Sequence, residues 1–233
     1  MKHKVLFQDL GLIAYKEAWD YQYQLFNTVA EAKKKSASEK TSDNSTPNYL
    51  VFCEHKHVYT IGKSGSEQNL LVDLLQLKAK DVEFFRIDRG GDITYHGPGQ
   101  IVGYPILDLE LFVSGIKEYI HMLEESVIRL LFDFGIKSTR LEGATGVWLD
   151  PGTPKLRKIC AIGVRTSRWV SMHGFAFNVN TNLEYFSLIN PCGFTDKSVT
   201  SMAKELGCPL DMNQVKIALK YHIAEVFGMY LEE

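Results

Sequence analysis

Apolar residues recur every three or four positions in three long segments, and this spacing constrains the fold more than any other feature of the sequence. It runs through Tyr15, Trp19, Tyr23, Phe26 and Ala30; through Ile116, Ile120, Leu123, Val127, Leu130 and Phe134; and through Val215, Leu219, Ile223 and Val226. The third segment begins at about Asp211, which has capping-box spacing with Gln214. The pattern predicts three amphipathic helices, each of which must bury one face.

Between these helices lie segments typical of strands. They are Tyr49–Cys53, Val58–Ile61, Glu83–Ile87, Gln100–Ile106, Val147–Leu149, Lys158–Val164 and Phe175–Val179. Several are short and joined by glycine-rich turns, which favours a mixed or antiparallel sheet with helices over a regular βαβ array. We therefore expect the α/β (or α+β) class, with residues 1–233 forming a single domain, since 45% of the side chains are apolar.

One polar stretch, at about residues 33–48, lacks apolar periodicity and contains Pro47. A segment of this composition buries too little surface to offset its ordering entropy. The sequence therefore predicts a mobile polar surface loop there.

Charge and hydropathy narrow the function classes. The 26 Lys and Arg against 28 Asp and Glu give a net charge of −2, without a long basic run, so we expect neither nucleic acid nor a membrane as a partner. Asp9 interrupts the first apolar stretch, and no run of about 18 apolar residues occurs. A cytoplasmic protein is expected.

The four cysteines, Cys53, Cys160, Cys192 and Cys208, form no CxxC pair and are expected to be free thiols. A metal site using Cys53 with His55 and His57 lacks a matching distant ligand pair, so no metal is expected. Cys192 lies in a Pro-Cys-Gly turn and Cys208 in a Gly-Cys-Pro turn, where a sulfur can meet a substrate. Local chemistry alone does not choose between these two.

The segment from Arg89 to Gln100 holds four glycines beside Arg, His and Tyr. Paired glycines let the backbone approach a ligand closely, but a tight hairpin explains them equally well. The spacing matches neither a GxxxxGK[ST] phosphate loop nor a Rossmann fingerprint.

Two later segments have strand character. In Arg157–Arg165, Lys158 lies near the strand start and is, from composition alone, more typical of a lysine pointing into water. In Ser171–Val179, alternation places Phe175, Phe177 and Val179 on one face and Gly174, Ala176 and Asn178 on the other. The face of small residues admits an apolar chain or, more commonly, a packed helix. His173 by itself is typical of a hydrogen-bonded structural histidine.

Taken in order, these segments resemble the lipoyl(octanoyl) transferase family. Its members share R-G-G-x-x-T-x-H-x-P-G-Q, then K-x-x-[AS]-[IL]-G-[VI], then H-G-x-[AS], then P-C-G, and this chain has all four. Glu54-His55 and the Val58–Gly62 stretch also look like the family's early strand. The resemblance covers about residues 49–201, and the ordered set is far more specific than any one motif.

The resemblance implies a biotin/lipoate protein ligase-like fold with a mixed β-sheet flanked by helices. It implies that Cys192 accepts an octanoyl group from octanoyl-acyl carrier protein, that Lys158 tunes it, and that the acyl group passes to a lysine of lipoyl domains. Those domains belong to 2-oxoacid dehydrogenase E2 subunits and the glycine cleavage H protein. The donor carries phosphopantetheine, and neither ATP nor a metal is expected. The expected substrate-binding residues are Arg89, Gly90, Gly91, Asp92, Ile93, Thr94, Tyr95, His96, Ala161, Ile162, Gly163, Gly174, Phe175 and Ala176, with His173 as a secondary candidate.

Two questions stay open at this level. In an unbroken strand Lys158 would point away from the face of Ala161 and Gly163, so a bulge or backbone contacts must intervene. An ATP-dependent lipoate or biotin protein ligase on the same fold, and a non-catalytic module that binds the acyl carrier, are the alternative functions.

Overall fold

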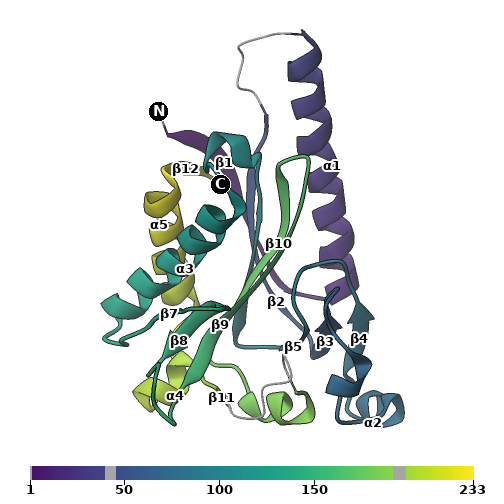
Figure 1. Ribbon diagram of the computed structural model, residues 1–233, viewed down its shortest axis with the longest axis vertical. Coiled ribbons are helices and arrows are strands. Elements are labelled where there is room, and N and C mark those ends of the chain that lie inside the picture. Colours follow the sequence, from purple (N-terminus) through teal and green to yellow (C-terminus); the bar gives the residue numbers. More distant parts are fainter. Residues whose placement is uncertain (1, 40–45, 191–197) are drawn as a thin grey trace.

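The computed structural model describes residues 2–39, 46–190 and 198–233 (Figure 1). Its helices are α1 (Tyr15–Glu39), α2 (Leu74–Ala79), α3 (Ile116–Asp133), α4 (Met202–Leu206) and α5 (Met212–Phe227), with short 3-10 turns at Glu67–Asn69, Leu109–Leu111 and Leu183–Leu188. Its strands are β1 (His3–Ile13), β2 (Tyr49–His55), β3 (Val58–Ile61), β4 (Glu83–Arg86), β5 (Ile93–His96), β6 (Gln100–Ile106), β7 (Thr139–Leu141), β8 (Ala144–Leu149), β9 (Arg157–Ser167), β10 (Val170–Asn178), β11 (Ser198–Val199) and β12 (Met229–Glu232).

A mixed sheet forms the centre of the molecule. In the described part of the chain it has nine strands in the order β12-β1-β2-β6-β10-β9-β8-β7, with β11 paired to β9. The pairs of β1 with β2 and β12, and of β9 with β11, are parallel. The successive pairs from β2 through β6, β10, β9 and β8 to β7 are antiparallel. The predicted class, a mixed sheet flanked by helices, is confirmed.

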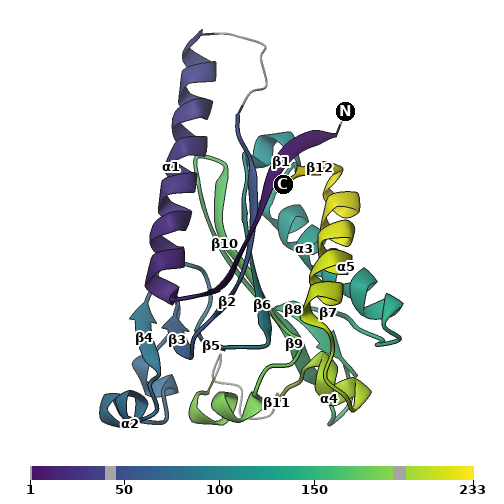
Figure 2. The same cartoon turned by 180° about the vertical axis from the view of Figure 1, so that it is seen from behind.

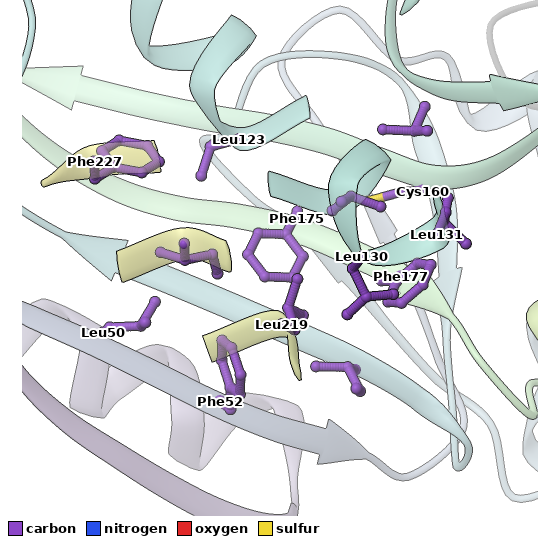
Figure 3. Close-up of a cluster of buried hydrophobic side chains, with 14 of the residues drawn as sticks. Leu50, Phe52, Leu123, Leu130, Leu131, Cys160, Phe175, Phe177, Leu219 and Phe227 are labelled. Atoms are coloured by element: carbon purple, nitrogen blue, oxygen red, sulfur yellow. The ribbon is translucent and has the colours of Figure 1, made fainter. Parts of the chain in front are cut away.

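The two faces of this sheet carry different helices. Helices α3 and α5 lie together on one face, and α1 lies against β10 and β6 on the other (Figures 1 and 2). Figure 3 shows the core on the α3/α5 side, where Phe175 and Phe177 meet Leu123, Leu130 and Leu219. Ala176, on the opposite face of β10, packs with side chains of α1. The alternation predicted for this strand is therefore confirmed.

A smaller sheet stands beside the first. It has the order β4-β3-β5 and packs with α2 and the 3-10 turn at Leu183–Leu188 around its own apolar cluster. Strand β5 begins two residues after the glycine pair of the Arg89–Gln100 segment, so four of the twelve residues of that segment belong to the small sheet. The small sheet thereby fixes where the glycine-rich residues lie.

The predicted surface loop at 33–48 was wrong in its first part. Residues 33–39 continue helix α1 to Glu39, 40–45 lie outside the described residues, and only 46–48 form irregular chain. Lys, Ala, Ser and Glu are adequate helix formers, and Lys33 pairs with Asp108 and, at 3.0 Å, with Glu110. This ion pair holds the helix against the rest of the molecule at a position that the spacing of apolar residues does not predict.

Two differences concern the chain ends, and the short elements α2, β5, β7, β11 and α4 were not predicted either. Strands β1 and β12 were not predicted, because β12 pairs with β1 across more than 200 positions and β1 pairs in turn with β2, and local patterns record neither pairing. Asp211 caps α5 by accepting a hydrogen bond from the backbone N–H of Asn213, at 2.8 Å, one residue before the expected Gln214. Across the described segments, no helix is long and apolar enough to cross a membrane.

Candidate active site

A cavity of about 420 Å³ lies over β8, β9, β10 and β6, and is bounded by the glycine-rich segment. This volume is in the usual range for small-molecule sites, roughly 300–1,000 Å³. Most of the predicted site residues line it: Arg89, Gly90, Gly91, Asp92, Ile93, Thr94, His96, Lys158, Ala161, Ile162, Gly163, His173, Gly174, Phe175 and Ala176. Three of the four separated motifs thus share one cavity, and the fourth, Pro191-Cys192-Gly193, lies outside the described residues.

Tyr95 is the exception among the predicted binding residues, because it does not line this cavity. Strand alternation turns it away from Thr94 and His96. It is fully buried in the small-sheet cluster, hydrogen-bonded to Nδ1 of His57 at 2.7 Å and stacked on Tyr185. Its position in the structure is that of a core residue.

The glycine-rich segment lies directly against β9. The backbone N–H of Gly90 donates to the carbonyl of Val164 at 3.0 Å. A Cβ added to Gly163 would come within 2.9 Å of the Gly90 carbonyl oxygen, which is closer than real Cβ contacts allow. The glycine at position 163 is therefore required by the close approach of these two backbones.

Arg89 is buried and anchors that segment. Its guanidinium donates to the carbonyl of Thr60 at 2.8 Å, to the Thr60 hydroxyl at 3.0 Å and to the Gly90 carbonyl at 3.0 Å. A guanidinium presents five donors in a rigid fork, so it can fix the backbone on two sides at once. Arg89 consequently joins β3 to the cavity wall.

His96 is buried, and both of its ring nitrogens are engaged. Nδ1 lies 2.8 Å from Oε1 of Gln100 and Nε2 lies 3.2 Å from the Thr60 hydroxyl. Gln100 uses its amide to donate to Asn178 at 2.9 Å, so its oxygen must accept from His96. Burial lowers the pKa of His96 well below the usual range, which keeps the ring neutral. This arrangement suits a positioning role better than proton transfer.

His173 has an unusual backbone. It adopts φ +60° inside β10, a conformation that costs a non-glycine residue roughly 1–3 kcal/mol. Nε2 lies 2.8 Å from Oδ1 of Asp88, and Oδ2 of Asp88 accepts from Tyr23 at 2.8 Å and pairs with Arg165 at 2.6 Å. The His173 hydrogen bond is the main cause of a pKa of Asp88 well below its usual range, and burial lowers the pKa of His173.

Asp88 is a site residue that the sequence reasoning missed. Since its carboxylate accepts the proton of Nε2, the neutral ring of His173 presents Nδ1 as an acceptor. Its position next to Arg89 in the chain was an available signal. His173 pairs with Val164 in β9, so it lies about 17 Å along the strand from Lys158. The two side chains therefore occupy different ends of the cavity.

Lys158 reaches the cavity because β9 contains a bulge. Val147 pairs with Cys160 but Trp148 pairs with Lys158, which leaves Ile159 as an extra residue. Ile159 and Cys160 both point into the core, while Lys158 shares the cavity with Ala161 and Gly163. A bulge of this kind re-aims the side chains on one side of it. The conflict raised by strict alternation is thus resolved by the expected bulge.

The cysteines differ sharply in their surroundings. Cys192 lies outside the described residues, between Asn190 and Ser198. Cys53 and Cys160 are fully buried, and burial raises the pKa of each thiol well above its usual range. Cys208 is exposed and does not line the cavity. Of the described thiols, none combines exposure with a place at this site.

The cavity also includes residues not predicted for it: Tyr15, Gln100, Val102, Tyr104, Ile120, Gly143, Ala144, Thr145, Trp148, Val164, Asn178, Phe186, Ser198 and Val199.

Within residues 2–39, 46–190 and 198–233, no group of three His, Cys, Asp or Glu side chains is arranged to hold a metal ion. The Sγ atom of Cys53 lies 3.5 Å from Nε2 of His55, whereas the ring of His57 stacks on that of Tyr185.

Known proteins are similar to this chain over almost its whole length. A family model described as the lipoyl protein ligase A/B catalytic domain matches residues 14–224. An octanoyltransferase of Parabacteroides distasonis is 57% identical over 95% of this chain and 98% of its own length. The chain belongs to the octanoyltransferase family. An octanoyltransferase of Flavobacterium johnsoniae, 54% identical over 97% of the chain and 98% of its own length, is another member.

Solved structures place this octanoyltransferase-family chain in the lipoate ligase fold. A bipartite lipoate protein ligase from Thermoplasma acidophilum superposes with a TM-score of 0.70 at 17% identity, covering 100% of this chain and 86% of the ligase. A lipoate-protein ligase A bound with ATP gives 0.68 at 16% identity, covering 100% and 88%. At this identity the likeness concerns the fold alone, which agrees with the fold expected from the motifs.

Proposed function

We propose that this chain is a lipoyl(octanoyl) transferase. It moves an octanoyl group from octanoyl-acyl carrier protein through a thioester on Cys192 to a lysine of lipoyl domains. The observation that carries the proposal is the 57% identity to an octanoyltransferase over nearly the whole of both chains. The cavity beside Lys158 supports it, because small residues on β9 and β10 leave room for an apolar chain.

In the proposed first half-reaction, Cys192 is the nucleophile. A free thiol has a pKa of about 8.5 and is mostly protonated at neutral pH, so a nearby ammonium such as that of Lys158 favours the thiolate. The thiolate attacks the thioester carbonyl of the donor, and the carbon–sulfur bond to phosphopantetheine breaks. The carrier leaves as a thiolate that takes up a proton. One thioester replaces another, so this step consumes no ATP.

In the proposed second half-reaction, the ε-amine of the acceptor lysine attacks octanoyl-Cys192. The amine has an ordinary pKa near 10.4 and must lose a proton, so a base is required. Lys158 serves as that base once acylation has removed its counter-charge. The product amide is more stable than the thioester, and this difference drives the sequence forward.

The described residues on either side of 191–197 bear on the proposed role of Cys192. The backbone N–H of Asn190 donates to the Asn69 carbonyl at 2.7 Å, beside the small sheet. Ser198 lines the cavity, and Val199 pairs with Lys158. The described residues that follow 191–197 therefore line the cavity that contains Lys158, which supports the proposed role of Cys192.

The remaining site assignments follow from the same cavity. We propose that the Arg89–His96 segment, Ala161–Gly163 and Gly174–Ala176 enclose the acyl chain. Tyr95, on the side of β5 that faces away from the cavity, holds this strand in place by packing in the small-sheet cluster. The acceptors are the lipoyl domains of 2-oxoacid dehydrogenase E2 subunits and the glycine cleavage H protein. No ATP or metal takes part.

Intact-protein mass spectrometry tests the proposal. After incubation with octanoyl-acyl carrier protein, we expect one octanoyl adduct, located on Cys192 by peptide mapping and lost in Cys192→Ser but not in Cys208→Ser. Persistent absence of the adduct would instead favour a non-catalytic carrier-binding module. ATP-dependent lipoylation that survives Cys192→Ser would establish a ligase.

A further inference from the structure

Gly146 of β8 lies beside the methylene stem of Lys158 and against the backbone of β9. A Cβ added to Gly146 would be 3.5 Å from both Cδ and Cε of Lys158 and only 2.5 Å from the carbonyl oxygen of Cys160. Gly146 also has φ +120°, which L side chains rarely adopt. The β8 backbone therefore approaches the Cys160 carbonyl too closely for a side chain at 146, and it does so beside the lysine stem where β9 bulges.

A buried carboxylate holds Gly146 in place. Glu124 of α3 is 4% exposed, and its Oε1 accepts the backbone N–H of Gly146 at 2.9 Å. Its Oε2 pairs with Arg140 at 3.2 Å. A carboxylate is stable in the interior only when it is paired in this way. Helix α3 thus fixes the strand that lies under Lys158.

The ring of Trp148 lies below the charged end of Lys158. The Lys158 Nζ atom is 4.5 Å from the ring centre, within the range of a cation–π contact. The indole N–H donates to the Ala144 carbonyl at 2.9 Å, and the ring is 2% exposed, so it cannot swing away. An aromatic face stabilises an ammonium but offers no such attraction to a neutral amine.

We propose that Trp148, with Gly146 and Glu124 behind it, is a positioning residue that holds Lys158 at the cavity wall as a charged ammonium. The inference rests on the proposed function, in which that ammonium favours the Cys192 thiolate. The inference also predicts that Trp148 affects the two half-reactions differently. Acylation needs the charged lysine, whereas the second transfer needs the neutral one, so Trp148 favours the first step over the second.

Substitutions of Trp148 in a Cys208→Ser background test the inference. The pH dependence of Cys192 alkylation by iodoacetamide reports thiol ionisation, and single-turnover reactions with octanoyl-acyl carrier protein and lipoyl domain report the two half-reactions. We expect the alkylation midpoint to rise in the order Trp, Phe, Leu, by about half a pH unit or more for Trp148→Leu. Acylation should slow about threefold or more in Trp148→Leu, because half a pH unit corresponds to about a threefold loss of thiolate, and the second transfer should slow less.

A folded Trp148→Leu variant with the wild-type alkylation midpoint and equal slowing of both half-reactions would overturn the inference. The alkylation assay needs no acyl donor. A wild-type chain that forms no adduct therefore refutes the proposed function, while the midpoint series still decides the role of Trp148. Thermal unfolding identifies any variant that has lost its fold.

Gly146→Ala provides a second perturbation with a matched control. Gly152 also has positive φ, +75°, but a Cβ there would meet nothing within 4 Å. Both alanines strain the backbone, and only the one at 146 meets Lys158 and Cys160. We expect Gly146→Ala to raise the alkylation midpoint and Gly152→Ala to leave it unchanged. Equal midpoints in the two folded variants would contradict the inference, and if Gly146→Ala does not fold, the Trp148 series still decides it.

Discussion

Replacing Asp88 by Asn isolates the electrostatic part of the contacts around His173. The carboxylate receives hydrogen bonds from His173 and Tyr23, each at 2.8 Å, and pairs with Arg165 at 2.6 Å. An amide of the same shape can still accept from Nε2 of His173. Its NH₂ group, however, would face two donors, Tyr23 and Arg165.

The expected destabilisation is about 2–3 kcal/mol. A hydrogen bond to a charged group contributes about 1.5–3 kcal/mol, and in the variant the Tyr23 hydroxyl no longer donates to a carboxylate. The Arg165 pair is about one-quarter exposed at each partner, so solvent screening limits its share to below about 1 kcal/mol. With a urea m-value of about 2.5 kcal/mol per molar for a chain of this size, the urea midpoint should fall by roughly 1 M.

The effect should also depend on pH in a defined direction. The pKa of Asp88 is depressed in the folded chain, mainly by the His173 hydrogen bond, from an ordinary value of 3.8. A depressed carboxyl pKa stabilises the fold fully above the unfolded value, and this stabilisation is lost as pH falls through the folded value. The difference between wild type and Asp88→Asn should therefore be constant near neutrality and shrink below about pH 4.

Urea unfolding at pH 7 and at pH 3, monitored by circular dichroism, measures the difference in stability between wild type and Asp88→Asn. Asp20→Asn is the matched control, because Asp20 pairs with Lys16 at the surface, and its loss should cost no more than about 0.5 kcal/mol. If Asp88→Asn were as mild as Asp20→Asn at pH 7, the expected contribution of the partly buried charge-assisted bonds at Asp88 would be refuted.

Three further predictions follow from the cavity and the α1 contact. Lys158→Ala should slow acylation about a hundredfold or more in single-turnover assays; wild-type rates in both half-reactions would refute its role. Gly163→Ala should raise the KM for the acyl donor more than it lowers kcat, because its Cβ would press on the Gly90 carbonyl; an unchanged KM in steady-state kinetics would argue against that contact. Lys33→Ala should lower the free energy of unfolding by about 1–2 kcal/mol in urea titrations, since Asp108 is buried and loses its ion-pair partner; no change would mean that the α1 extension adds nothing to stability.

The long periodic helices and the alternating strand were readable from the sequence because their information is local. Leu123, Leu130 and Leu219 fall on the buried faces that their spacing predicts. The cavity wall of Gly174 and Ala176 follows from the same rule applied to a strand. In contrast, Lys33 continues a helix because Asp108, 75 positions away, meets it, and a local pattern holds no record of that contact.

What the sequence by itself determined was the fold class, the two faces of β10 and, through the ordered motifs, the family. Tertiary structure alone decided how the chemistry is aimed. The bulge at Ile159 turns Lys158 onto the cavity face, and the left-handed backbone at His173 brings its ring to Asp88. Both depend on pairing and packing between separate elements, which compensate local strain that neither segment would adopt alone.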